Sequence, residues 1–334
     1  MTPKKFISIP KRPRRNRRSA SVRDLTRETM VTPADLVYPI FVTEGKNVRE
    51  AISSMPGIKR LSLDLLAKEC REVAGLGIPA VALFPKISDR KKDSLAAESK
   101  NPRGLIPRSV REIKSAVPEL TVITDVAMDP YSSDGHDGVV RDGQIVNDET
   151  LPVLADMAVA QAKAGADYVA PSDMMDGRIG YIRRALDEAG LTDTGILAYS
   201  AKYASAYYGP FRDALDSAPK AGDKKSYQMD YANVREAVRE VLLDEEEGAD
   251  IVMVKPAGLY LDVIMRIRAV TELPVAAYHV SGEYALIKAA AAKGWVDEDA
   301  AVREALTAIK RAGADIIFTY FAKAFARSFQ SSRS

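Results

Sequence analysis

The sequence predicts an α/β protein, a (β/α)8 TIM barrel that carries an extended basic N-terminal arm. Three observations support this fold: eight short apolar runs, helical patterns between most of them, and a glycine-containing junction that recurs before several runs. Eight strand–helix units over about 285 residues suit a closed barrel better than an open doubly wound sheet. We therefore divide the chain into an arm at residues 1–30 and a barrel at residues 31–334.

The composition is that of a globular protein. Of 334 residues, 28% are charged and 46% are hydrophobic, and these proportions exclude wholesale disorder. No run of 18 apolar residues is present, so we expect no transmembrane helix and no membrane partner. The N-terminus lacks the apolar core of a secretory signal. The single cysteine, Cys70, cannot form an intramolecular disulfide, and we predict a cytoplasmic location.

The basic charge is concentrated in the arm. Residues 1–30 contain ten Lys and Arg against Asp24 and Glu28, a charge of +8; the whole chain has +2, so the remainder has −6. Such an arm could bind nucleic acid through phosphates, cover an acidic neighbouring subunit, or be a solvated tail. Phe6 is its single aromatic residue, which gives base stacking little support. We therefore expect contact with another subunit and no nucleic acid partner.

The predicted strands are continuously apolar, as expected for strands buried on both faces. Each is four to seven residues long and is bounded by Gly, Pro or Asp. The eight runs are Leu36–Val42, Pro79–Phe84, Thr121–Ala127, Asp167–Ala170, Gly195–Tyr199, Asp250–Val254, Pro274–Val280 and Asp315–Tyr320.

Helical patterns alternate with most of these strands. Three junctions share the sequence Gly-Ala-Asp, at 165–167, 248–250 and 313–315, and in each the glycine ends a helix just before a strand. This alternation implies a parallel sheet. No G-x-G-x-x-G motif follows a strand, so we expect no dinucleotide and no other organic cofactor. The clearest helical segments are Leu151–Lys163, Val234–Glu247, Leu259–Ala269 and Ala300–Arg311.

In a barrel of this kind the active residues lie just after the carboxyl ends of the strands. Lys202 and Lys255 are the unusual residues there, because an apolar barrel mouth disfavours an ammonium group. Burial and a second ammonium both lower a lysine pKa, and a neutral lysine amine forms Schiff bases with ketones. The alternative is that each lysine extends to the rim with its charge in water. The polar residues at these strand ends are Asp125, Ser172, Asp173, Ser200, Lys202, Lys255, Ser281 and Tyr320.

Six segments form longer motifs: Ala170–Arg178, Tyr199–Ser205, Tyr207–Ala214, Tyr227–Asp230, Met253–Pro256 and His279–Tyr284. They resemble the porphobilinogen synthase family, also called the delta-aminolevulinic acid dehydratases. The resemblance extends in order from about Arg14 to the end of the chain. It implies a homo-oligomer, usually an octamer, of a hydro-lyase that condenses two 5-aminolevulinate molecules into porphobilinogen with loss of two waters, an early step of tetrapyrrole and heme biosynthesis.

The resemblance also implies the roles of individual residues. Lys255 would be the principal Schiff-base lysine, and Lys202 would engage the second substrate. The donors to one substrate carboxylate would be Arg212, Lys224 and Gln228, and those to the other would be Ser281 and Tyr320. Taken alone, Arg212 and Lys224 would be ordinary surface charges.

The amino end of the first substrate would lie against three polar side chains. Ser172 and Asp173 could equally cap a helix or stabilise a loop. Aromatic residues would line the pocket, although core packing explains them as well. The polar residues are Asp125, Ser172 and Asp173, and the aromatic ones are Tyr199, Tyr208 and Phe211.

Zinc-dependent members of the family carry cysteines at the positions of Ala127, Asp129 and Asp137. The chain therefore resembles the magnesium-responsive or metal-independent branch, with no zinc at the active site. Asp129, Asp134 and Asp137 could bind a hard cation, or residues 127–148 could form a Gly- and Asp-rich loop over the barrel mouth.

Glu240 matches the family position of an allosteric magnesium ion away from the active site. One carboxylate and several waters can hold Mg²⁺. The acidic residues 244–247 that follow make a solvated helix face the alternative explanation.

Three other functions compete with this interpretation. A class I aldolase would need one Schiff-base lysine and a sugar-phosphate site. A nucleic-acid-binding protein would act through the basic arm, and a catalytically dead homologue would act as a scaffold. The paired lysines and the carboxylate donors favour the Schiff-base dehydratase.

Overall fold

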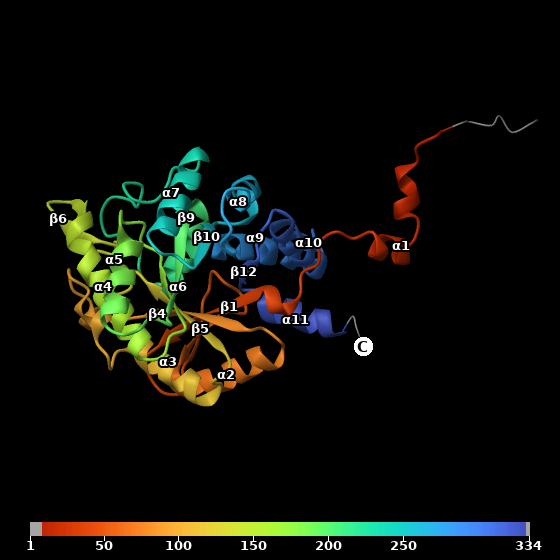
Figure 1. The fold of residues 1–334 in the computed structure, drawn as a ribbon. Helices are drawn as coiled ribbons and strands as arrows, with labels where there is room; N and C mark the ends of the chain where they lie inside the picture. The colour runs from red at the N-terminus through yellow and green to blue at the C-terminus, as the bar shows by residue number, and fades with distance from the viewer. Residues whose placement is uncertain (1–8, 332–334) are drawn as a thin grey trace, which may run out of the picture.

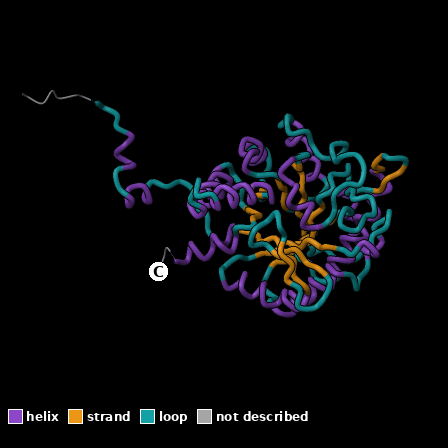
Figure 2. Tube along the Cα trace, turned by 180° about the vertical axis from the view of Figure 1, so that it is seen from behind, coloured by secondary structure: helices purple, strands orange, loops and turns teal. Residues whose placement is uncertain are grey.

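Eight parallel strands form a closed barrel in the computed structural model of the chain, which describes residues 9–331. Around the ring they are β1 (Leu36–Thr43), β4 (Ala80–Lys86), β5 (Thr121–Val126), β8 (Tyr168–Pro171), β9 (Gly195–Lys202), β10 (Ile251–Lys255), β11 (Val275–His279) and β12 (Ile316–Thr319). The ring closes where β12 pairs with β1, with Leu36 opposite Ile317. Figure 2 shows the strands at the centre and the helices around them. The predicted (β/α)8 TIM barrel is confirmed, and each predicted apolar run coincides with one strand.

The helices pack their apolar faces on the outside of the barrel, since the strands are buried on both sides. They are α2 (Leu63–Gly75), α3 (Leu105–Ala116), α4 (Asn147–Lys163), α5 (Arg178–Glu188), α6 (Gly209–Leu215), α7 (Arg235–Glu246), α8 (Leu261–Arg268), α9 (Ser281–Ala292), α10 (Glu298–Arg311) and α11 (Ala322–Ser331). Short 3-10 helices are η2 (Pro33–Asp35), η3 (Asp89–Lys91), η4 (Ala97–Lys100), η5 (Ala206–Tyr208) and η6 (Gly258–Tyr260).

The recurrent glycine junctions end their helices as expected. Gly165, Gly248 and Gly313 have φ angles of +103°, +103° and +118°. A side chain would be strained in this left-handed region, whereas glycine adopts it freely. Each glycine is followed within a few residues by a barrel strand, so the junction directs the chain from the outer layer back to the ring.

Two hairpins extend the barrel. β2 (Arg49–Ala51) and β3 (Lys59–Ser62) are antiparallel to each other, and β3 pairs with the end of β1. β6 (Val139–Arg141) and β7 (Gln144–Val146) form a hairpin after β5. Most of residues 127–139 are buried, so the first half of the polar loop expected at 127–148 packs against the barrel and only its tip faces solvent.

The N-terminal arm projects away from the barrel (Figures 1 and 2). It contains η1 (Pro13–Arg17) and α1 (Ala20–Leu25), and neither has a buried residue. Leu25 is 85% and Met30 61% exposed. An arm with uncovered apolar side chains and a large positive charge has a surface suited to another subunit. Within residues 9–331, no helix has the length and apolarity needed to cross a bilayer.

Candidate functional site

Lys202 and Lys255 are the last residues of β9 and β10. They are direct partners in the ladder between these strands, so their side chains point to the same face of the sheet. Both are buried, with 6% and 5% of their surface exposed. The alternative in which each lysine reaches bulk water is therefore wrong.

Four aromatic rings surround the amino group of Lys255. Its Nζ lies 4.7 Å from the ring centre of Tyr278, 4.9 Å from Phe211, 5.1 Å from Tyr199 and 5.2 Å from Tyr208. Burial among these rings, followed by the charge of the neighbouring lysine, lowers the pKa of Lys255 to about 7. A substantial fraction of this side chain is thus a neutral amine near neutral pH, which is the form that attacks a ketone.

Lys202 is held by the loop that follows β8. Its Nζ donates a hydrogen bond to the carbonyl oxygen of Ser172. The same nitrogen lies 6.0 Å from the ring centre of Tyr199. The Tyr199 ring therefore faces both lysine nitrogens, and the two amines share one cavity.

A group of buried acids also lines this cavity. Asp125 and Asp129 are buried, and desolvation raises the pKa of Asp125 to about 7, with the charge of Asp129 adding to the effect. Lys224 Nζ donates hydrogen bonds to Asp129 at 3.2 Å and to Asp137 at 3.1 Å. Burial alone would raise the pKa of Asp137, but the charges of Lys224 and Lys202 and the hydrogen bonds of its carboxylate together outweigh burial, and the pKa falls to about 2. Lys224 is 6% exposed, so it is not the surface charge that its residue type suggests.

The cavity is narrow in this conformation, with a volume of about 20 Å³, room for little more than one water molecule. Gln228 is buried and its Oε1 has no hydrogen-bond partner among the described residues. The lining residues are Asp125, Asp129, Asp137, Ser172, Lys202, Tyr208, Phe211, Arg212, Lys224, Gln228 and Lys255.

Ser281 and Tyr320 do not line the narrow cavity themselves, but each contacts a residue whose ring surrounds the Lys255 amine. The hydroxyl of Ser281 accepts a hydrogen bond from Phe211 N at 3.0 Å and donates to the Tyr207 carbonyl at 3.3 Å. The hydroxyls of Tyr320 and Tyr278 are 2.9 Å apart. Both residues therefore touch a member of the aromatic wall around Lys255.

Asp173 does not line the cavity. Its Oδ1 accepts a hydrogen bond from Met175 N at 2.7 Å, and its Oδ2 lies 3.9 Å from Arg178 Nε. In this conformation its carboxylate stabilises the loop after β8, which is the alternative given above. Burial raises the pKa of Asp173 to about 6, and the Arg178 charge opposes this.

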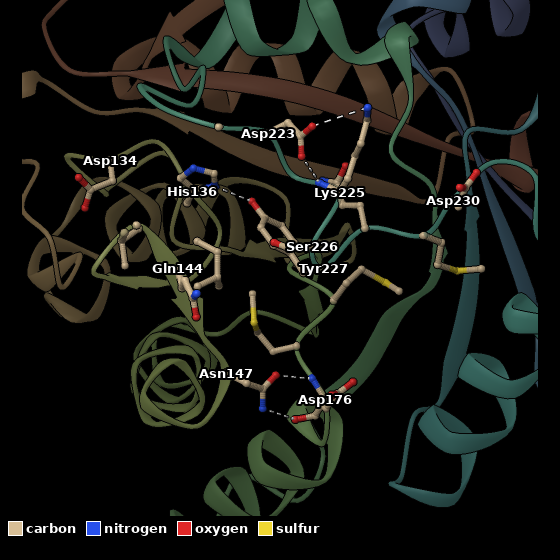
Figure 3. A pocket seen from close by; sticks show the side chains of 18 of the residues that line it. Asp134, His136, Gln144, Asn147, Asp176, Asp223, Lys225, Ser226, Tyr227 and Asp230 are labelled. Atoms are coloured by element: carbon tan, nitrogen blue, oxygen red, sulfur yellow. Dashed lines mark hydrogen bonds and ion pairs between the residues drawn. The ribbon is translucent and has the colours of Figure 1, made fainter.

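A larger cavity of about 870 Å³ adjoins the narrow one, and Gln228 lines both. Figure 3 shows His136 and Tyr227 pointing toward each other in its wall. Asp176 and Glu240 line the same cavity. The two lysines are thus separated from this larger space by the chain segment that carries Lys224 and Gln228.

The sequence matches the family described as Delta-aminolevulinic acid dehydratase over residues 10–328. The chain belongs to this family. A delta-aminolevulinic acid dehydratase of Chlamydia pneumoniae is 54% identical over 316 residues, which cover 95% of each chain. A chloroplastic one from Physcomitrium patens is 57% identical, over 95% of this chain and 73% of the relative.

A solved delta-aminolevulinic acid dehydratase has nearly the same fold. It is the porphobilinogen synthase of Toxoplasma gondii ME49 in complex with the reaction product porphobilinogen. The TM-score is 0.95 at 53% sequence identity, and the match covers 97% of this chain and 92% of the other. Because the match covers nearly the whole chain, the likeness includes the loops and helices around the barrel as well as its strands.

Ala127, Asp129 and Asp137 are the positions that the resemblance assigns to the zinc-binding cysteines of other members. Ala127 has no ligand atom, and Asp129 and Asp137 both bind Lys224. A protein ammonium thus occupies the space between the two carboxylates, and oxygen donors lack the softness that a tetrahedral zinc site favours. Across residues 9–331, no group of three or more His, Cys, Asp or Glu could hold a metal ion.

Sequence reasoning missed two features of this dehydratase site. Tyr278, the ring nearest to Lys255, lies inside a predicted strand, and its inward direction would have followed from the alternation of side chains along β11. The contacts of Lys224 with Asp129 and Asp137 join residues 95 and 87 positions apart. No local pattern signals that pairing.

Proposed function

We propose that this chain is a porphobilinogen synthase that joins two 5-aminolevulinate molecules through Schiff bases on Lys255 and Lys202. The observation that carries the proposal is the pair of buried, register-matched amines, one of them with a pKa of about 7. Family membership supports the same activity.

The chemistry follows from the neutral amine. The Lys255 nitrogen attacks the substrate ketone, a C–N bond forms, and the ketone oxygen leaves as water. The resulting iminium withdraws electrons from the adjacent carbon, which can then lose a proton and form a bond to the second substrate. A substrate amino nitrogen then bonds to the other former ketone carbon and closes the ring, and elimination of both lysine nitrogens breaks the Schiff-base C–N bonds and regenerates the amines. Both ketone oxygens have left as water, so two substrate molecules minus two waters give the pyrrole product.

Charged and polar groups around the lysines would hold the substrate ends. Arg212, Lys224 and Gln228 share the cavity with both lysines, and a guanidinium and an ammonium suit a carboxylate. Ser281 and Tyr320, behind the aromatic wall, would hold the second carboxylate once Phe211 moves. The amino group of the first substrate would lie against Asp125 and Ser172 in the acidic wall, with Asp173 supporting the loop.

Trapping with borohydride tests the proposal. The purified chain is incubated with 5-aminolevulinate and borohydride, and the adduct is located by peptide mass spectrometry. We expect it chiefly on Lys255, and we expect Lys255→Ala to lower turnover by roughly three orders of magnitude or more. The exposed Lys100→Ala is the matched control and should behave as the wild type. Normal turnover by Lys255→Ala would contradict the proposal. A pyrrole colour assay separates it from an aldolase, which forms no pyrrole.

We also propose that Mg²⁺ stimulates the enzyme through Glu240 and that zinc plays no role at the lysines. Burial raises the pKa of Glu240, and the Arg178 charge opposes this. Such a carboxylate gains from a cation with several waters. After treatment with chelator, added Mg²⁺ should raise activity several-fold in the wild type and not in Glu240→Gln, whereas Zn²⁺ should not. Equal stimulation of both proteins by Mg²⁺ would exclude this role.

We further propose that the arm at residues 1–30 contacts a neighbouring subunit in a homo-octamer. Its exposed apolar side chains and positive charge support this, because the rest of the chain is acidic. The cytoplasmic location stays a prediction, since matched relatives include bacterial proteins and others named chloroplastic.

A further inference from the structure

We propose that His136 is a positioning residue that fixes the segment of residues 216–234 against the barrel and thereby seats Lys224 and Gln228 beside the two catalytic lysines. This segment links α6 to α7 and contains no helix or strand, apart from a bridge at Met229. The inference rests on the proposed function for its kinetic test, although its structural test is independent of turnover.

Four consecutive residues after β5 form a docking strip for the segment. The carbonyl of Asp134 accepts a hydrogen bond from Lys220 N at 3.1 Å. A Cβ placed on Gly135 would lie 2.4 Å from the Ala218 carbonyl oxygen, so the two backbones approach too closely for any side chain. Asp137 contributes its carboxylate to Lys224 and its backbone N–H to the Tyr227 hydroxyl, at 3.1 and 3.3 Å.

His136 supplies the central contact of this strip. Its Nε2 is 2.9 Å from the carbonyl oxygen of Ala221, and its Nδ1 is 3.2 Å from the hydroxyl of Tyr227. Because a carbonyl only accepts, Nε2 carries the hydrogen, and Nδ1 of the neutral ring accepts from Tyr227. The Tyr227 oxygen is then free to accept from Asp137 N, so every polar atom in the group has a compatible partner.

The two anchors of His136 bracket Lys224. Ala221 lies three residues before it and Tyr227 three residues after it, and the imidazole joins both points to the barrel. Figure 3 shows the contact of His136 with Tyr227. His136 is 8% exposed, which makes these hydrogen bonds costly to replace with water. The ring thus determines where the Lys224 ammonium and the Gln228 amide lie.

Movement of this segment is the simplest way to admit substrate. The cavity at the lysines has a volume of about 20 Å³, whereas the adjoining space has about 870 Å³, and Gln228 is part of both walls. The remaining walls include the ends of β5, β9 and β10, the loops after β5 and β8, and residues of η5 and α6. When residues 216–234 close again onto the docking strip, Lys224 would return to its place beside the carboxylate of the bound substrate. Loss of His136 should therefore weaken substrate binding more than it slows the chemical steps.

The test compares His136→Ala with His136→Gln. The alanine removes both hydrogen bonds, whereas a glutamine amide offers one donor and one acceptor at a similar separation. We expect His136→Ala to raise KM for 5-aminolevulinate about tenfold, the equivalent of one or two hydrogen bonds, with a smaller fall in kcat. Backbone hydrogen exchange of residues 216–234 should become faster. His136→Gln should restore both quantities to within about threefold of the wild type.

Two glycine variants provide a second, matched comparison. Gly135 and Gly190 have φ angles of +71° and +72°, but a Cβ on Gly190 meets nothing within 4 Å. Gly135→Ala should therefore speed exchange of residues 216–234 and raise KM, whereas Gly190→Ala should change neither. An unchanged KM in His136→Ala would overturn the proposal, with or without faster exchange. So would a His136→Gln protein that behaves like the alanine variant. A chain that lacks turnover altogether would refute the proposed function, while the exchange comparison would still decide the docking role.

Discussion

The amino group of Lys255 shows how neighbouring side chains determine the reactivity of a common residue. Burial among four rings removes water from the ammonium, and the adjacent lysine adds repulsion, so its pKa lies near 7. The charge of Asp125 acts in the opposite direction and favours the ammonium. The pKa of Lys255 is thus a balance between burial and the neighbouring lysine, which lower it, and the nearby acids, which raise it.

A pH profile checks this balance. Below the pKa the side chain is an ammonium and cannot attack, so kcat/KM should rise with pH and reach half its maximum near pH 7. Asp125→Asn removes a charge that raises the pKa of Lys255, so the half-maximum should move to lower pH even if the plateau falls. The measurement is kcat/KM between about pH 5.5 and pH 9.

The exposed Asp156→Asn is the control for that profile, since Asp156 pairs only with the exposed Lys100 among its described ion-pair contacts. Its profile should coincide with that of the wild type. An Asp125→Asn profile with the wild-type midpoint would show that Asp125 does not influence the Lys255 amine.

The sequence predicts where a residue lies when its position relative to a strand is enough to place it. Lys202 and Lys255 follow apolar runs, and any barrel places such residues at its mouth. The burial of Lys224 could not be foreseen, because its partners lie on a loop far away in the sequence. Asp173, in contrast, is held by near neighbours, Met175 and Arg178, in the way that the loop-stabilising alternative predicts.

At the scale of elements, a buried ion pair joins α5 to α7. The Arg178 guanidinium donates to Asp244 at 3.0 and 3.2 Å, and one of its nitrogens also donates to the Tyr199 carbonyl at 3.4 Å. Arg178 and Asp244 are both 2% exposed. One side chain therefore connects the start of α5, the body of α7 and the strand that carries Lys202.

Removal of one partner of this buried ion pair should destabilise the fold strongly. Asp244→Ala removes the carboxylate that hydrogen-bonds the buried guanidinium and leaves the more distant Asp173, at 3.9 Å, as its remaining ion-pair partner. Loss of one partner of a buried pair typically costs about 3–5 kcal/mol of unfolding free energy. Asp156→Ala, which breaks an exposed pair, should cost less than about 1 kcal/mol. Urea unfolding of both variants measures the difference, and similar midpoints would show that the buried pair contributes little.

The elements themselves were largely predictable, because buried parallel strands are apolar throughout and glycine ends the preceding helix. The residues at which strands and helices end were less predictable. β9 continues to Lys202, beyond the apolar run that ends at Tyr199, because its backbone stays paired with β10 through Lys255. The β2–β3 hairpin is short and mostly polar, so it lacks the apolar pattern that marks a strand. The strands of the β6–β7 hairpin contain valine and isoleucine but are only three residues long each, which is too short for a pattern to show.

For the whole molecule, the arm is the feature that a single chain does not explain. Deletion of residues 1–30 should yield smaller particles, because the exposed Leu25 and Met30 then lose the partner surface on which we propose they pack. Light scattering after size exclusion measures the mass of full-length and truncated protein. An unchanged mass, together with salt-sensitive affinity for DNA or RNA, would favour the nucleic-acid alternative instead.

The ladder pairing of Lys202 with Lys255 also has an evolutionary consequence. Strand spacing in a sheet is nearly constant at about 4.8 Å, so descendants of this barrel that keep the register of β9 and β10 keep the two lysines as neighbours. The stretch from residue 216 to 234 lies outside the ladder, and its Lys224 and Gln228 line the cavity. New preferences among keto acids would therefore arise by replacing these two side chains, whereas one residue inserted into β9 or β10 before its lysine would turn that lysine to the other face of the sheet.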